Sequence, residues 1–151
     1  MWKIALVLVL FIILASLFTY KTLFIDPSKV NVESPVVKGS NAIYVTDQPP
    51  APYIVINEVL LSKKGYVVIY EDNQGKLGNI IGNTKIMAEG RSKNVIAGLI
   101  RPTIESEALF AILSEDSGDG IFSPGIDIPI KDEEGNVVSV RFSIDQNAPA
   151  P

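Results

Sequence analysis

The chain contains no cysteine and no histidine among its 151 residues. The missing cysteine excludes disulfide bonds, thiolate metal ligands, cysteine nucleophiles and lipid attachment through cysteine. The missing histidine excludes imidazole zinc sites and every catalytic triad that uses histidine as its base. A domain of this composition must therefore be stabilised by its own hydrophobic core, without covalent cross-links.

The sequence also lacks an excess of basic residues: lysine plus arginine number 13 and aspartate plus glutamate 17, a net charge of −4. Nucleic-acid binding requires a positive surface, so no nucleic-acid partner is expected. Residues 115–134 contain seven acidic residues and one lysine, a net of −6, whereas the other residues from 41 to 151 contain eight of each sign. One segment therefore carries the whole negative excess.

Residues 4–18 form an apolar run behind a short positively charged head. The 17 residues 4–20 would span roughly 25 Å as a helix, the short end of what a bilayer needs. Residues 1–25 are expected to be an uncleaved, single-pass N-terminal anchor in the cell membrane, with the rest of the chain on the extracytoplasmic side. A cleaved signal peptide is the main alternative, although residues 15–18 lack the pair of small residues that cleavage needs. Residues 26–40 are expected to be a juxtamembrane linker.

Short β-branched and aromatic stretches separated by turn residues make up residues 41–146. Strands are expected at residues 41–46, 53–61, 65–70, 93–100, 107–113 and 138–144, with an irregular strand region at 77–87 and a turn at 71–75. About seven strands at this spacing predict an all-β fold, a small antiparallel β-sandwich of the immunoglobulin-like kind. Residues 107–113 also fit a short helix, which would make the domain a mixed α+β fold. Residues 147–151 are expected to be a disordered tail.

Three stretches follow one another between residues 65 and 138: GYVVIYEDNQGKLGNIIG, AEGRSKNVIAGL and ALFAILSEDSGDGIFSPGIDIPIKDEEGNVV. In this order they resemble an uncharacterised extracytoplasmic domain of archaeal and bacterial surface proteins, the domain-of-unknown-function family numbered seventy-two eighty-two. The resemblance covers residues 53–144 and implies a β domain outside the cytoplasm with no established activity. The chain departs from the family's loop motif at Glu115, Ser117 and Ser123.

The acidic segment begins with a loop in which oxygen-bearing side chains occupy the first, third, fifth and ninth positions, with glycine at the sixth. This spacing is typical of loops that wrap Ca²⁺, which also take a backbone carbonyl from the seventh position. The acidic twelfth ligand is displaced by one residue, and two of the side chains are serines, so any binding would be weak. A solvated acidic turn is the other interpretation. The candidate ligands are Glu115, Ser117, Asp119, Ile121 through its carbonyl, Ser123 and Asp127.

Carboxylates of the same loop, such as Glu115 with Asp119 or Asp127, are the main candidates that the sequence offers for catalysis; a Ser–Lys dyad is also open, although no S-x-x-K element is present. Acid–base hydrolysis by such a pair needs a substrate cleft and one carboxyl of raised pKa. The sequence therefore favours a membrane-anchored extracytoplasmic module with a structural or binding role, and a surface or envelope partner, over an enzyme. A small carboxylate-dependent surface hydrolase is the alternative.

Overall fold

The computed structural model describes residues 40–151. The predicted anchor, residues 1–25, and the predicted linker up to residue 39 lie outside the described residues. Within residues 40–151, no helix has the length and apolar character needed to cross a membrane. The expected tail, residues 147–151, begins within a turn in which the Ala148 N–H donates to the carbonyl of Asp145 at 2.9 Å.

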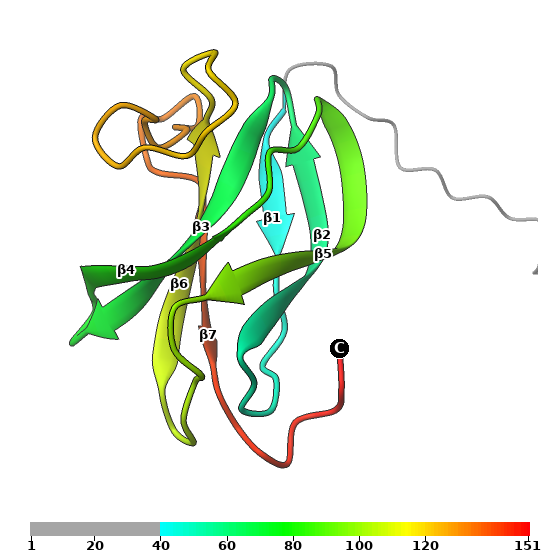
Figure 1. The fold of residues 1–151 in the computed structure, drawn as a ribbon, viewed down its shortest axis with the longest axis vertical. Coiled ribbons are helices and arrows are strands. Elements are labelled where there is room, and N and C mark those ends of the chain that lie inside the picture. Colours follow the sequence, from blue (N-terminus) through cyan, green and yellow to red (C-terminus); the bar gives the residue numbers. More distant parts are fainter. Residues whose placement is uncertain (1–39) are drawn as a thin grey trace, which may run out of the picture. The chain divides into compact units, whose positions relative to one another are not determined.

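The described residues form seven β-strands and no helix (Figure 1). All pair in an antiparallel manner within one sheet, in the order β1-β2-β5-β4-β3-β6-β7. The predicted all-β, antiparallel domain is thereby confirmed. The strands are β1 (Ala42–Tyr44), β2 (Tyr53–Leu61), β3 (Gly65–Asn73), β4 (Lys76–Thr84), β5 (Gly90–Leu99), β6 (Ala108–Glu115) and β7 (Ser139–Ser143).

The sheet curves until its two edge strands, β1 and β7, are nearly joined. Just after β1, the N–H of Gln48 donates to the Ser143 carbonyl at 3.3 Å, and the Gln48 carbonyl accepts from Asp145 N–H at 3.1 Å. The carboxylate of Asp47 accepts from Ser143 N–H at 2.7 Å. The expectation of two separate facing sheets is corrected here, because β4 pairs with both β3 and β5 and makes the ladder continuous.

Alternate residues of the strands point into the interior of the curved sheet and form its core. On β3, Val67 and Ile69 belong to this core, whereas Tyr66 and Val68 lie on the opposite face of the strand and are buried as well. β3 is therefore covered on both faces. The fully buried core residues of the other strands include Ile54, Ile56, Ala97, Leu109, Ala111 and Leu113.

The hairpin of β3 and β4 is longer than the sequence indicates. The turn expected at residues 71–75 is reduced to Gln74 and Gly75, whose φ angles are both positive at 57° and 82°. Two consecutive positive φ angles match the twist of a tight β-hairpin. Residues 77–87, expected to be irregular, form a single strand as far as Thr84, with two register shifts against β3.

The two C-terminal strands agree with the sequence patterns. Residues 107–113 fall largely within β6, so the strand interpretation is confirmed and the helix is excluded. The strand expected at residues 138–144 is β7, in which Phe142 is buried and the neighbouring Arg141 is exposed. This alternation is the signature of a strand with one face on the core.

Candidate functional site

The loop after β6 is organised around one buried carboxylate, that of Asp127, which is 4% exposed. Its Oδ2 accepts from the N–H of Ser123 at 2.7 Å, and its Oδ1 accepts from the N–H of Ser117 at 2.8 Å. These hydrogen bonds favour the ionised form, so they hold the pKa of Asp127 below its usual value. The carboxylate thus ties together two parts of the loop that are six residues apart in the sequence.

A second carboxylate, Asp116, joins this loop to β3. Its Oδ1 accepts from the N–H of Gly120 at 3.1 Å and from the hydroxyl of Tyr66 at 3.2 Å. The Asp116 N–H donates to the carbonyl of Lys64 at 3.1 Å. Asp116 was not among the candidates from the sequence, because it falls between the alternate positions of a Ca²⁺ loop. Its only signal was membership of the acidic segment.

Three of the six candidate Ca²⁺ ligands, Ser117, Ser123 and Asp127, lie close together, and hydrogen bonds between them hold them there. The Asp127 carboxylate accepts hydrogen bonds from the backbone N–H groups of Ser117 and Ser123. Glu115 is directed elsewhere, to the ammonium of Lys63 at 2.7 Å. An ion bound here would have to compete with these internal partners.

The other two candidates lie at the tip of the loop. Asp119 accepts from the N–H of Ile121 at 2.9 Å, which shapes the tip, and the Ile121 side chain is exposed. Within residues 40–151, no three residues of the kinds His, Cys, Asp or Glu are grouped so that they could hold a metal ion. The Ca²⁺ site stays a prediction, and its test is given in the Discussion.

The same contacts bear on acid–base chemistry. A carboxyl that serves as a general acid near neutral pH needs a raised pKa. Hydrogen bonding moves the pKa of Asp127 in the opposite direction, and Glu115 is bound to Lys63. The geometry of these groups therefore adds no support for the alternative of a hydrolase.

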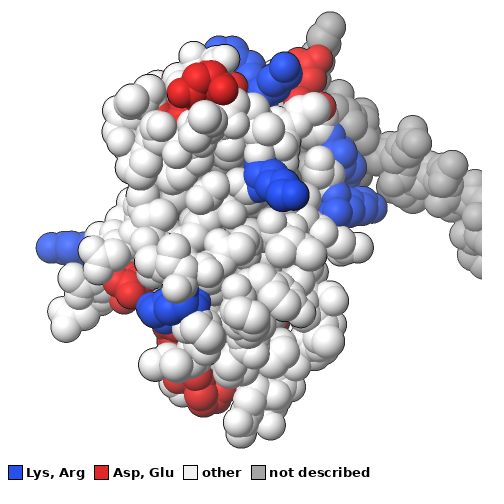
Figure 2. All heavy atoms as spheres, in the orientation of Figure 1, with Lys and Arg blue, Asp and Glu red and all other residues white. Residues whose placement is uncertain are grey.

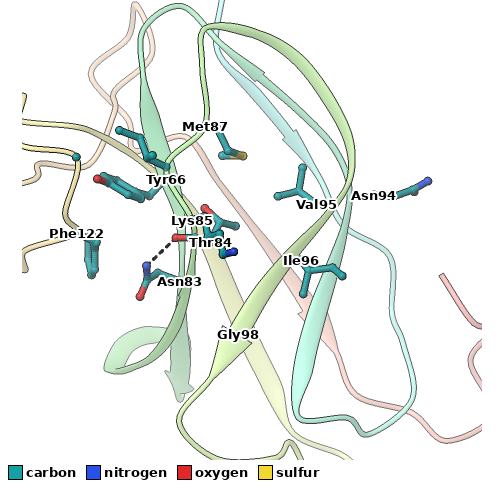
Figure 3. A pocket seen from close by; sticks show the side chains of 12 residues that line it. Tyr66, Asn83, Thr84, Lys85, Met87, Asn94, Val95, Ile96, Gly98 and Phe122 are labelled. Carbon is teal, nitrogen blue, oxygen red and sulfur yellow. Dashed lines mark hydrogen bonds between the residues drawn. The ribbon is translucent and has the colours of Figure 1, made fainter.

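Beside the acidic loop, a groove of about 1000 Å³ opens between β4 and β5 (Figure 3). One wall is the chain of residues 83–87, at the end of β4, and the other is β5 at residues 94–98. Tyr66, Gly120 and Phe122 complete the lining next to the acidic loop. The groove therefore lies where three segments distant in the sequence meet.

The groove exists because β4 and β5 separate after pairing over a short distance. Their last pair is Thr84 with Ala97. Beyond it the chain turns toward β3, where Met87 and Gly65 exchange two backbone hydrogen bonds of 2.9 and 3.1 Å. β5 meanwhile continues along β2, so the two walls diverge. The sequence marked residues 77–87 as irregular, but it did not predict that this wall would part from β5 after Thr84.

The end of the groove next to the acidic loop is aromatic and close to negative charge. The rings of Tyr66 and Phe122 lie with their centroids 5.6 Å apart. Burial, and after it the charge and the hydrogen bond of Asp116, raise the pKa of Tyr66 to about 12. The hydroxyl therefore stays protonated and keeps donating to Asp116 at every physiological pH.

The groove is bordered by exposed apolar side chains from both walls, with Ile86 40% and Ile96 60% exposed. Figure 2 shows a face on which acidic atoms lie mainly toward the upper and lower ends, and whose middle is mostly uncharged surface with a few separate basic side chains. Sequence analysis missed Ile96, although a signal was present: it lies between Val95 and Ala97, which point inward, and so occupies an outward position of β5. A single exposed isoleucine is ordinary on a protein surface, and Ile96 is informative because it lines the same groove as Ile86.

Comparison with protein families gives one match. The family described as Domain of unknown function (DUF7282) matches residues 41–145. The chain belongs to this family. The membership predicted from the motifs is thus confirmed. No curated protein and no solved structure matches the chain significantly.

In this member of DUF7282, two of the candidate loop positions are serines that contact Asp127 through their backbones. Ser117 and Ser123 serve the loop through backbone N–H groups, which every residue except proline provides. Asp127, by contrast, supplies both acceptor oxygens. These bonds of the loop therefore depend on the side chain of Asp127.

A separate ion-pair network lies at the far end of β3. Arg101 donates to Glu71 at 2.7 Å and also bonds to Glu107, so it joins β3 to the connection between β5 and β6. These hydrogen bonds from Arg101 lower the pKa of Glu71. On the neighbouring residue of β3, Asp72 pairs with Arg141 of β7 at 2.7 Å. The network ties strands together and lies away from the groove.

Proposed function

We propose that this chain is a membrane-anchored module on the extracytoplasmic side of the cell, and that its β domain binds a surface or envelope partner through the groove between β4 and β5. The observation that carries the proposal is the exposed apolar border of the groove, formed by Ile86 and Ile96 from opposite walls. A single ligand would cover both side chains. Apolar side chains that gather around a concavity mark interaction sites, whereas scattered ones do not.

The placement of the module rests on the sequence. The apolar residues 4–18 support an anchor, and the likeness of the motifs to extracytoplasmic surface domains supports the side of the membrane. The intact mass of the protein from the membrane fraction decides whether the anchor is kept. A mature chain that begins between residues 17 and 26 would contradict the anchor, and resistance of the domain to protease added outside intact cells would contradict its side.

Binding through the groove is tested by photo-crosslinking in the native membrane. A photoreactive amino acid placed at Ile96 should form an adduct with the partner on irradiation. The matched control is Ile100, which is 82% exposed and does not line the groove. An adduct at position 96 and none at position 100 is the expected result. Equal adducts at both positions, or none at either, would contradict the proposal.

A further inference from the structure

One edge of β5 is paired along the whole strand, and the other is mostly open. On the first edge, β5 pairs with β2 from Gly90 to Gly98. On the second edge, it pairs with β4 only from Ala97 to Leu99. Among residues 40–151 no other strand continues this second edge toward Gly90. The open edge borders the groove, which is lined by residues 94–98 of β5.

The direction of the backbone groups follows from the two-residue period of a strand. The Ile100 N–H donates across to Ile81 on the β4 side at 2.8 Å, whereas the Leu99 N–H donates to Pro52 on the β2 side at 3.3 Å. The N–H and C=O groups of alternate residues therefore point to the β4 side, and those of Ile96 are among them. Beyond Thr84 the β4 wall has turned away, so the N–H and C=O of Ile96 face the groove.

We propose that the groove receives an extended segment of a partner protein, which adds to the open edge of β5 as an extra strand; this rests on the proposed function. An open strand edge next to a pocket is the arrangement that strand-addition domains use: the backbone gives affinity and the pocket selects alternate side chains. In Figure 3, Val95 projects across the opening toward Met87, so every second side chain of the added segment would meet an apolar surface.

The charges around the groove define the partner further. At the end next to the acidic loop, Asp116 bonds to both Tyr66 and Gly120, and the negative charges of Asp127 and Asp119 also act on the Tyr66 hydroxyl. Among the described residues that line the groove, Lys85 is the only charged one, so the negative charge comes from the acidic loop just beyond the lining. The segment that fits is therefore extended, apolar at alternate positions and basic at the end that lies against the acidic loop.

The part of β5 nearer Gly90 is protected against unselective pairing. Arg91 and Lys93 are charged, with side chains 35% and 66% exposed, and both pair with Glu58 of β2. Asn94, at the end of the stretch that lines the groove, has a left-handed φ of 51°, which interrupts the regular edge. Charges and local distortions of this kind prevent edge-to-edge association between copies. They confine strand addition to the short free edge at Ile96, between Asn94 and the pairing with β4 that begins at Ala97, and they favour a foreign segment over a second copy of the chain.

The test uses the full-length chain in detergent micelles and fluorescein-labelled hexapeptides, read by fluorescence anisotropy. The parent peptide has a lysine followed by alternating valine and threonine; a second has glutamate for lysine, and a third has N-methyl groups on the amides that would face β5. The parent should bind saturably. The N-methylated peptide should bind about tenfold more weakly or worse, because it loses backbone hydrogen bonds and keeps its side chains. The glutamate peptide should also bind more weakly.

A protein variant provides the second arm. Ile96→Asp should abolish binding of the parent peptide, whereas Ile100→Asp places the same charge at an exposed isoleucine outside the groove and should leave binding unchanged. Absence of saturable binding, equal affinity for the N-methylated peptide, or equal effects of the two variants would overturn strand addition. If photo-crosslinking at Ile96 still identifies a foreign partner, the proposed function stands and only strand addition fails. An adduct with the mass of two copies would make the occupant a second copy and overturn the inference.

Discussion

The closure of the sheet depends on one buried side chain, that of Gln48, which is 2% exposed. Its Oε1 accepts from the N–H of Val55 at 2.9 Å, and its Nε2 donates to the carbonyl of Val55 at 3.1 Å. The backbone of Gln48 meanwhile bonds to Ser143 and Asp145 at the end of β7. We therefore predict that Gln48→Ala weakens the whole domain and does more than disturb a loop.

The magnitude follows from what the substitution leaves behind. With the amide removed, both polar backbone groups of Val55 lose their partner in a region that Gln48 shields from water. Each buried group left unpaired costs about 1–3 kcal/mol, so Gln48→Ala should lower the free energy of unfolding by about 2–6 kcal/mol. Domains of this size are stabilised by only about 5–15 kcal/mol, and the midpoint of thermal unfolding should fall by roughly 10 °C or more.

The assay is urea unfolding of residues 40–151 followed by circular dichroism, because the single tryptophan, Trp2, lies outside this fragment. The matched control is Gln146→Ala, the same substitution at an exposed glutamine, which should change stability by less than about 0.5 kcal/mol. A loss below about 1 kcal/mol in Gln48→Ala would mean that water replaces the amide. It would refute the assignment of Gln48 as the residue that holds the sheet closed.

Three further predictions concern the loop, the aromatic end of the groove and β3. Calcium at several times the roughly millimolar range of weak extracellular sites should raise the melting temperature of the domain, and Asp119→Ala should abolish the rise; no shift would mean that the loop is only a turn. The free energy of unfolding should fall as pH rises from 10 to about 12, because the unfolded chain loses the Tyr66 proton near pH 10 whereas the folded state keeps it up to a pKa of about 12. Urea titrations of Tyr66→Phe should lack this part of the loss. A variant with the same pH slope as the parent would contradict the burial of that hydroxyl. Val68→Asp places an unpaired charge at a fully buried position and should lower the free energy of unfolding by at least about 3 kcal/mol. The control, Val137→Asp at a 36% exposed valine, should lower it by less than about 1 kcal/mol. Equal melting temperatures of the two variants would refute the burial of β3 on both faces.

Features that depend on neighbouring residues were predictable from the sequence. The alternation of Val140 and Phe142 with polar residues is enough to place the last strand, and β-branched residues place β2 and β3. The family could be recognised for the same reason, since its motifs are short stretches in a fixed order. The excess of acid in residues 115–134 correctly directed attention to the loop after β6, although the partners of its carboxylates were not foreseen.

Only the tertiary structure decided how the strands close and where the groove lies, because those features join residues far apart in the chain. Asp116 meets Tyr66 across 50 positions, and Asp47 meets Ser143 across 96. Local propensity carries no information about such pairs, and the same seven strands could pair as two sheets or as one. Whether one sheet or two sheets form depends on which segments pair their polar backbone groups with one another in the interior. The side chain of Gln48 does this at the seam of the sheet, and the divergence of β4 from β5 leaves one edge of β5 open.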